Sequence, residues 1–283
     1  MSFISIITVN YNDANGLEET IKSVMVQTYR DYEHIVVDGD SSDGSKEVIE
    51  KYRDTLAWAV SEPDKGIYNA MNKGIAKANG VYILFLNSGD TLAQKNIIER
   101  IHHRLKGGKD IYYGKLKLAD EKNETVLDFP EKLSFGYFYD KGYLPHPASF
   151  IKRSLFDTIF RYDEKLKIAA DWEFMVCAVC KYNVSYEYID LIITNYDVDG
   201  ISAKPEYRKV LLSEKQLILQ RHFPLFLDDA EKYQNQNSLL AMNRFSMLQR
   251  IETNSVARKL ASLCLRIIHL LFVSKNERES DKL

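Results

Sequence analysis

Cysteine is scarce in this sequence: its 283 residues include only Cys177, Cys180 and Cys264. Three thiols are too few for a disulfide framework. Cys177 and Cys180 form a C-x-x-C pair, but the sequence has no second pair to complete a zinc site. Both lie among apolar neighbours in a stretch typical of a helix, so we predict that they pack in the core as thiols.

An excess of basic residues is also missing. The chain has 38 Lys and Arg against 40 Asp and Glu, which gives a formal net charge of −2. Nucleic-acid-binding proteins usually have a basic excess, so we expect no nucleic-acid partner. The first apolar run has no basic segment before it and no small-residue cleavage site, which predicts a cytoplasmic protein.

Two glycine-rich phosphate-binding motifs are absent as well. The first predicted strand lacks a G-x-G-x-x-G turn, and G-x-x-x-x-G-K-[ST] occurs nowhere. These absences disfavour hydride transfer with a dinucleotide and P-loop hydrolysis. The predicted strands instead end near one aromatic residue and three acids: Tyr11, Asp38, Asp64 and Asp90. Such a set suits a nucleotide base, a ribose and a metal-bound diphosphate.

Apolar runs and amphipathic segments alternate through the N-terminal third of the chain. Strands are predicted at 3–9, 33–38 and 55–60 and from 81 onward, and helices at 16–27, after 44 and at 67–78. This alternation predicts right-handed βαβ units and a mostly parallel sheet. A hydrophobic content of 45% supplies enough material for its core.

The stretch 81–90, VYILFLNSGD, changes abruptly from apolar to polar. It is typical of a central strand buried on both faces that ends in an exposed loop, where open α/β sheets bind ligands. Asp90 in this loop could coordinate a hard divalent cation that grips a phosphate. Alternatively, Asp90 could cap a helix that starts near Gln94.

Beyond residue 90 the alternation becomes less regular. We predict helices at 97–105 and 171–182, strands at 110–118, 125–129 and 148–151, and extended chain at 184–196. The aromatic-rich stretch 135–146 is predicted as a loop that either stacks on a sugar or covers the sheet.

The C-terminal part is predicted to be a helical extension, with segments at 205–223, 238–250 and 255–273. The last segment combines basic residues with a wide apolar face, and it is too short and too charged to span a bilayer. It could lie in a membrane interface or pack as an ordinary or dimer-forming helix. We predict three parts: a domain at 1–203, this extension at 204–275 and a disordered tail at 276–283.

Six motifs in this order resemble a bacterial family 2 glycosyltransferase over residues 2–202: SIITVNYN, QTYRDYEHIVVDGDSSDGS, SEPDKGIYNAMNKGI, NSGD, HPASFIKRSLF and IAADWEF. The resemblance implies the GT-A fold, an α/β Rossmann-like, mostly parallel sheet flanked by helices. It is strongest to the branch that assembles capsular, colanic-acid-like or lipopolysaccharide O-chains.

The resemblance also implies roles for individual residues. Asp171 matches the catalytic base, although it could also cap its helix, and Asp90 matches the acid that binds Mn²⁺ or Mg²⁺. Gly39 and Gly89 stand where many family members have acids. The residues expected at the donor are Thr8, Val9, Tyr11, Asp38, Asp64, Lys65, Ser88, His146 and Ser202. His146 has an alternative structural interpretation.

Together these features predict a metal-dependent, inverting glycosyltransferase. The donor would be a nucleotide sugar, and the acceptor a glycan or lipid-linked glycan, with peripheral contact to the inner membrane or homodimerisation through the C-terminal helix. Two alternatives stay open. One is a catalytically silent nucleotide-sugar-binding scaffold, and the other is a sugar nucleotidyltransferase.

Overall fold

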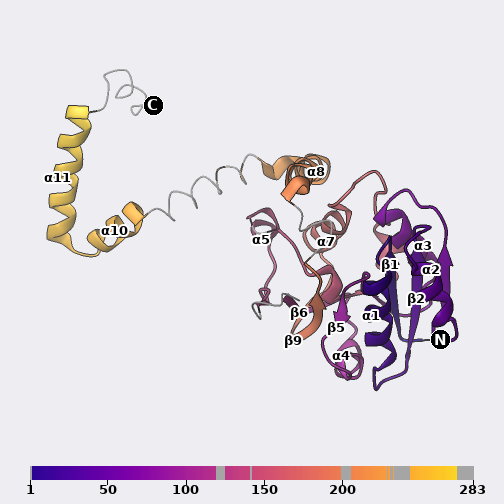
Figure 1. The fold of residues 1–283 in the computed structure, drawn as a ribbon. Helices are drawn as coiled ribbons and strands as arrows, with labels where there is room; N and C mark the ends of the chain where they lie inside the picture. The colour runs from indigo at the N-terminus through magenta and orange to yellow at the C-terminus, as the bar shows by residue number, and fades with distance from the viewer. Residues whose placement is uncertain are drawn as a thin grey trace. The chain divides into compact units, whose positions relative to one another are not determined.

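The computed structural model describes residues 2–118, 125–140, 142–198, 205–227, 229, 232 and 243–272. The chain divides into two compact units, Met1–Pro224 and Leu225–Leu283. The first contains the sheet with its helices, and the second contains α10 (Asn243–Glu252) and α11 (Ser255–Phe272) (Figure 1).

The division after Pro224 differs from the predicted boundary at 203/204. Helix α8 (Arg208–His222), which we assigned to the C-terminal extension, belongs to the first unit. The predicted boundary itself and the tail 276–283 lie outside the described residues.

Four parallel strands form the N-terminal half of the sheet, in the order β3-β2-β1-β4. They are β1 (Ile4–Asn10), β2 (Tyr32–Asp38), β3 (Trp58–Ser61) and β4 (Tyr82–Phe85). Helices α1 (Ala14–Met25), α2 (Ser45–Lys51) and α3 (Ile67–Lys77) connect them. The predicted βαβ units are therefore present, and the ends of all four strands lie at one edge.

Helices cover both faces of this parallel half. Leu17 and Ile21 of α1 pack with Val36 of β2, while a Cβ on Gly74 of α3 would lie 2.5 Å from Ile7 of β1. Ile7 pairs in register with Ile35, the neighbour of Val36, so α1 and α3 pack on opposite faces. Burial on both faces explains why the strands are almost continuously apolar.

The C-terminal half of the sheet mixes strand directions. β8 (Ser149–Lys152) pairs antiparallel with both β4 and β6 (Ile111–Leu118), and β9 (Tyr186–Tyr196) runs parallel to β6. β5 (Thr91–Leu92), directly after the NSGD loop, pairs with the end of β9. This pairing brings the residue after β9, Asp197, back beside that loop. The short β7 (Val126–Leu127) pairs with β6.

The remaining helices among the described residues of the first unit are α4 (Ile97–Leu105), α5 (Phe135–Asp140), α6 (Leu155–Thr158) and α7 (Ala170–Cys180). The 3-10 turns in the described part of the chain are η1 (Arg53–Thr55), η2 (His146–Ala148), η4 (Pro205–Tyr207) and, at the division between the units, η5 (Pro224–Phe226). No described helix is long and apolar enough to cross a membrane.

Helix α5 corrects the prediction of a loop over 135–146. Phe138 in this helix is fully buried, whereas Tyr143 after it is 45% exposed. The stretch therefore covers the core with at least one of its aromatic side chains.

Candidate functional site

Three loops meet at the carboxyl edge of the parallel strands. A Cβ built on Gly39 would lie 2.7 Å from Asp64 Oδ2 and 3.1 Å from Tyr11 Cδ2. Tyr11 is 68% exposed, and Asp64 Oδ1 accepts a hydrogen bond of 2.8 Å from the Gly66 backbone N–H. Only a glycine at position 39 allows this approach, so an exposed aromatic ring and a carboxylate lie side by side.

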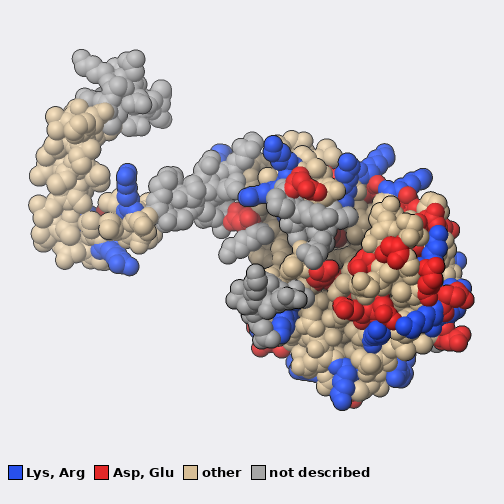
Figure 2. Space-filling view, in the orientation of Figure 1, with Lys and Arg blue, Asp and Glu red and all other residues tan. Residues whose placement is uncertain are grey.

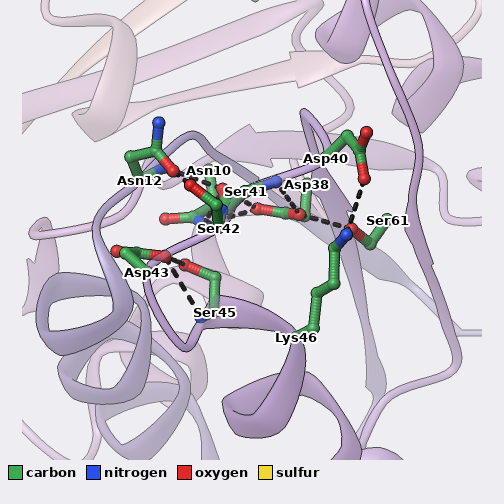
Figure 3. A network of polar contacts seen from close by, with 10 residues as sticks. All are labelled: Asn10, Asn12, Asp38, Asp40, Ser41, Ser42, Asp43, Ser45, Lys46 and Ser61. Atoms are coloured by element: carbon green, nitrogen blue, oxygen red, sulfur yellow. Dashed lines mark hydrogen bonds and ion pairs between the residues drawn. The ribbon is translucent and has the colours of Figure 1, made fainter.

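Beneath this cluster, Asp38 is fully buried and holds the loops together (Figure 3). Its Oδ1 accepts hydrogen bonds from Asn10 Nδ2 and Ser41 Oγ, both at 2.6 Å. Its Oδ2 accepts from the Ser41 backbone N–H at 3.0 Å and from Ser61 Oγ at 2.5 Å. Burial would raise the pKa of Asp38, but these hydrogen bonds outweigh it and hold the pKa below its usual value. Asp38, predicted at the nucleoside, is thus bonded on both oxygens within the protein.

Further polar contacts tie the loop after β1 to the loop after β2 (Figure 3). The Asn12 backbone N–H donates to Ser41 Oγ at 2.7 Å, and Asn12 Oδ1 accepts from the Ser42 backbone N–H at 3.0 Å. Asp43 accepts from the Ala14 backbone N–H at 2.8 Å. The network leaves little freedom to the backbone that carries Tyr11 and Gly39. Asp and Glu side chains also gather over the N-terminal strands and helices (Figure 2).

Thr8 and Val9, predicted at the nucleotide base, have side chains buried in the sheet. Thr8 Oγ1 is hydrogen-bonded to His34 Nε2 at 2.9 Å. Of the three residues predicted in this stretch, Tyr11 is therefore the one whose side chain is exposed. Lys65 is exposed, and its backbone N–H donates to Asn69 Oδ1 at 3.3 Å.

The NSGD loop is anchored to β1 and α1. The Ser88 backbone N–H donates to the Val9 carbonyl at 3.1 Å. Thr20 Oγ1 of α1 donates to the carbonyl oxygens of Asn87 and Asp90, at 3.2 and 2.8 Å. The loop is thus fixed at the same edge as the Tyr11 cluster.

Asp90 is 3% exposed and does not cap a helix, because the N-cap of α4 is Asn96. Its Oδ1 accepts a hydrogen bond of 3.0 Å from the Asp197 backbone N–H. Burial raises the pKa of Asp90 to about 7, and the negative charge of Asp197 adds to the rise. Both effects would be relieved by a cation bound to the carboxylate.

Asp197 is a residue that the sequence analysis missed. Its Oδ2 would lie 2.5 Å from a Cβ on Gly89, which adopts a φ of +91°. Gly89 stands where many members of the family that this sequence resembles have an acid. Here it packs against the carboxylate of Asp197, which follows β9. An acid directly after a predicted strand was the available signal, but only the pairing of β9 with β5 shows where it lies.

The described residues contain no group of three or more His, Cys, Asp or Glu that could hold a metal ion. Asp90 and Asp197 offer two hard carboxylates. Mg²⁺ and Mn²⁺ commonly retain waters and substrate phosphate oxygens as further ligands, so this donor set fits such a cation.

Asp171 lies in the first turn of α7, whose N-cap is Ala169, so it is not the helix cap. Its Oδ1 accepts a hydrogen bond of 2.8 Å from the hydroxyl of Tyr68 in α3. Burial, and then the nearby charge of Asp171, raise the pKa of Tyr68 well above its usual value, so the phenol stays protonated. Asp171 Oδ2 makes no hydrogen bond with a described residue, and the side chain is partly exposed.

Glu214 of α8 is a second residue that the sequence analysis missed. Its carboxylate accepts the backbone N–H groups of Lys167, Ile168 and Ala169, at 2.7, 3.0 and 3.0 Å. These groups directly precede α7, where helix formation leaves N–H groups without intrahelical partners. Glu214 therefore fixes the start of the helix that carries Asp171.

A second contact between α8 and α7 involves Glu173, which is 2% exposed. Its Oε1 accepts from Arg221 Nη1 at 3.0 Å and lies 2.8 Å from His222 Nε2. Lys215 also stacks over the Trp172 ring, with Nζ 4.8 Å from the ring centroid. Helix α8 thus braces α7 at several points.

His146 is buried beneath the site. Its ring stacks on Phe85 at the end of β4, with a centroid distance of 4.6 Å, and Nε2 lies 2.8 Å from the Tyr162 hydroxyl. Burial lowers the pKa of His146, which keeps the imidazole neutral. These contacts favour its structural interpretation. Ser202, the remaining predicted donor residue, lies outside the described residues.

The two cysteines of the C-x-x-C pair lie on α7 as predicted. Cys177 is buried, and Cys180 is partly buried. Burial raises the pKa of Cys177 to about 12 and that of Cys180 to about 11, so both remain thiols.

The sequence of the chain is similar to those of known glycosyltransferases. Residues 5–160 match the family model described as Glycosyl transferase family 2. An uncharacterized glycosyltransferase of Mycobacterium tuberculosis is 32% identical over 230 residues, which cover 78% of this chain and 85% of that protein. A PGL/p-HBAD biosynthesis glycosyltransferase of Mycobacterium bovis is 26% identical over 205 residues, covering 69% and 77%.

The fold is also similar to a solved structure, that of S. aureus TarS in complex with UDP-GlcNAc. The TM-score is 0.58 and the identity 21%, over 69% of this chain and 58% of that one.

Proposed function

Because the chain belongs to glycosyl transferase family 2, we propose that it moves a sugar from a nucleoside-diphosphate donor to a hydroxyl group of a glycan or lipid-linked glycan, with inversion. The predicted GT-A fold and the predicted glycosyltransferase class are both confirmed. The observation that carries the proposed mechanism is the Tyr68–Asp171 hydrogen bond, which holds one oxygen of a partly exposed carboxylate beside the site.

In this proposal the donor lies along the carboxyl edge of the strands. The exposed Tyr11 ring stacks on the nucleotide base, and Asp64 accepts hydrogen bonds from the ribose hydroxyls. Asp38 contributes indirectly, because its oxygens hold the loops that carry Tyr11 and Gly39. The UDP-GlcNAc bound to TarS supports a nucleoside-diphosphate sugar as the donor here.

Asp171 acts as the general base. The acceptor hydroxyl attacks the anomeric carbon, its proton passes to Asp171 Oδ2, and the bond from the anomeric carbon to the diphosphate breaks. Tyr68, protonated and donating to Oδ1, leaves Oδ2 to face the acceptor. A base on the acceptor side and a leaving group opposite give a single displacement with inversion. A positioned base typically contributes on the order of 10²–10⁴-fold to the rate.

Asp90 and Asp197 would hold a divalent cation, Mg²⁺ or Mn²⁺, at the donor diphosphate. Such a cation, when bound, stabilises the negative charge of the leaving nucleoside diphosphate. The proposal rests on the burial of Asp90 and on the second carboxylate beside Gly89. The predicted branch of surface-polysaccharide synthesis remains a prediction.

The experiment begins with the donor. Thermal unfolding of the full chain is followed with a panel of nucleoside diphosphates, with Mn²⁺ and with chelator. A ligand that binds only the native state raises the melting temperature. The nucleoside diphosphate that raises it in the presence of Mn²⁺ therefore identifies the base of the donor.

Transfer and binding are then compared in Asp171→Asn with the donor so identified. We expect the rate to fall by about 10²–10⁴-fold with an unchanged Kd for the donor, because the amide cannot accept the proton. Loss of donor binding would show a structural role for Asp171. Binding without transfer by the native protein on any glycan tested would support the silent scaffold. Release of pyrophosphate from a nucleoside triphosphate supplied with a sugar 1-phosphate would support a nucleotidyltransferase.

A further inference from the structure

Helix α11 has two sharply different faces. Successive residues of an α-helix are rotated by about 100° around the helix axis. Viewed along that axis, the polar side chains of α11 fall within an arc of about 100° and the apolar ones within an arc of about 220°. The strip on the narrow side, here called the basic strip, consists of Ser255, Arg258, Lys259, Ser262, Arg266 and His269. The apolar face is the rest of the helix.

The apolar face is exposed in the described structure. No residue of α10 or α11 is buried, and Leu271 and Phe272 are 70% and 81% exposed. The other large apolar side chains that are exposed on α11 are Val256, Leu260, Leu263, Leu265, Ile267, Ile268 and Leu270. Contiguous apolar surface of this kind marks a binding surface for a protein or a membrane.

The charge of α11 points to an anionic partner. Residues 255–272 contain Arg258, Lys259 and Arg266 but no Asp or Glu, although the whole chain carries a net charge of −2. The coloured residues of this unit in Figure 2 are mostly uncharged, and α10 and α11 together contain a single acid, Glu252. A basic strip beside a wide apolar face matches the anionic headgroups and acyl chains of a bilayer surface.

The width of the apolar face argues against a single partner helix. A coiled-coil seam uses two positions in seven, a narrow stripe, whereas this face covers more than half of the circumference. A helix that lies parallel to a membrane surface can bury the whole of such a face among the lipids. Within its described bounds, α11 is not long and apolar enough to cross a membrane.

We propose that α11 lies in the interface of an anionic lipid bilayer, with its apolar face among the acyl chains and its basic strip at the headgroup phosphates. The resulting attachment is peripheral, and it holds the chain at a membrane surface independently of sugar transfer.

The test is flotation of the full-length protein with phosphatidylcholine vesicles that contain or lack phosphatidylglycerol. We expect binding to the anionic vesicles, reduced at least ten-fold in Leu263→Gln/Leu271→Gln, which makes the apolar face polar. Ser262→Gln places the same side chain on the basic strip and should bind like the native protein. Arg258→Gln/Arg266→Gln should weaken binding to anionic vesicles several-fold and remove most of its salt dependence.

Cys264 provides a second readout, because it is exposed and lies at the middle of the apolar face. In a Cys180→Ser background, an environment-sensitive dye on Cys264 should shift its emission to the blue on anionic vesicles. Neither readout depends on transfer, so failure of this proposal is distinguishable from failure of the proposed function.

Two results would overturn the proposal. One is equal flotation of the native protein and Leu263→Gln/Leu271→Gln, or no flotation of either. The other is a native dimer that becomes monomeric in Leu263→Gln/Leu271→Gln without any vesicle binding, which would assign the apolar face to a second copy of the chain.

Discussion

The hydroxyl of Tyr68 donates a 2.8 Å hydrogen bond to Asp171 Oδ1, joining α3 to α7 across 103 positions of sequence. Tyr68 is 4% exposed, whereas Asp171 is partly exposed. A buried, protonated donor therefore fixes the orientation of a carboxylate that is partly exposed to solvent. Asp171 is thus already oriented in the folded protein without a ligand, as the proposed general base requires.

Removal of this hydrogen bond should affect turnover more than donor binding. In Tyr68→Phe we expect kcat to fall about ten-fold or more, because a hydrogen bond to a charged group contributes about 1.5–3 kcal/mol. The KM for the donor should stay the same. Steady-state kinetics would measure both parameters.

Tyr52→Phe is the matched control, since the Tyr52 hydroxyl donates a 2.8 Å hydrogen bond to Glu18 on α1. An equal fall of kcat in the two variants would mean that Tyr68 acts through general stability and not through Asp171.

The second carboxylate beside the NSGD loop can be tested by its metal dependence. Asp197→Asn keeps the size of the side chain and the backbone N–H that bonds to Asp90. We expect donor binding to weaken about ten-fold when Mn²⁺ is present, because an amide is a poorer ligand for a hard cation. When a chelator removes the metal, donor binding by Asp197→Asn should equal that of the native protein. Isothermal titration would measure both affinities.

The control for Asp197 is Asp190→Asn on β9, the strand that Asp197 follows; the Asp190 side chain is 80% exposed and lies 2.6 Å from Lys115 Nζ. Weakening of the same size with chelator present would contradict a role of Asp197 as a metal ligand.

The brace between α8 and α7 predicts a combined loss of stability and activity. Glu214→Ala removes the acceptor for three backbone N–H groups, one of them on the fully buried Ala169. An unsatisfied buried donor costs about 1–3 kcal/mol, so the free energy of unfolding should fall by at least that amount. Urea unfolding would measure the loss, and kcat should fall with it because Asp171 follows directly in α7.

Glu206→Ala, an exposed acid just before α8, is the control for Glu214 and should change neither quantity. Full stability in Glu214→Ala would show that the start of α7 is held by other contacts.

His34 predicts a dependence of stability on pH. Burial lowers the pKa of His34 from 6.5 to about 3 in the folded protein. Between pH 3 and pH 6.5 the unfolded chain binds a proton at His34 that the native chain does not. The contribution of neutral His34 to the free energy of unfolding is therefore fully present above about pH 6.5 and decreases as the pH falls toward 3. At pH 5 this difference amounts to about 2 kcal/mol.

His34→Gln should therefore lose about 2 kcal/mol less stability than the native protein between pH 7 and pH 5. Urea unfolding at the two pH values measures the difference, with His103→Gln, an exposed histidine of α4, as the control. Parallel losses in the native protein and His34→Gln would refute the assignment.

The sequence by itself determined the parallel half of the sheet and its order of strands and helices. Apolar runs such as 81–86 can be buried on both faces only within a covered sheet, and alternation with helices requires parallel strands. Asp90 and Tyr11 were recognisable for the same reason, since the polar residues that directly follow such strands must lie at one edge.

Only the tertiary structure decided what surrounds those residues. Asp197 follows β9, and its position depends on the pairing of β9 with β5. Glu214 lies within α8, and its role depends on the contact of α8 with the start of α7. The burial of Asp38 and His146 likewise depends on loops that converge from distant positions. Local sequence records which side chains are acidic or apolar, but the contacts that orient them form between segments many residues apart.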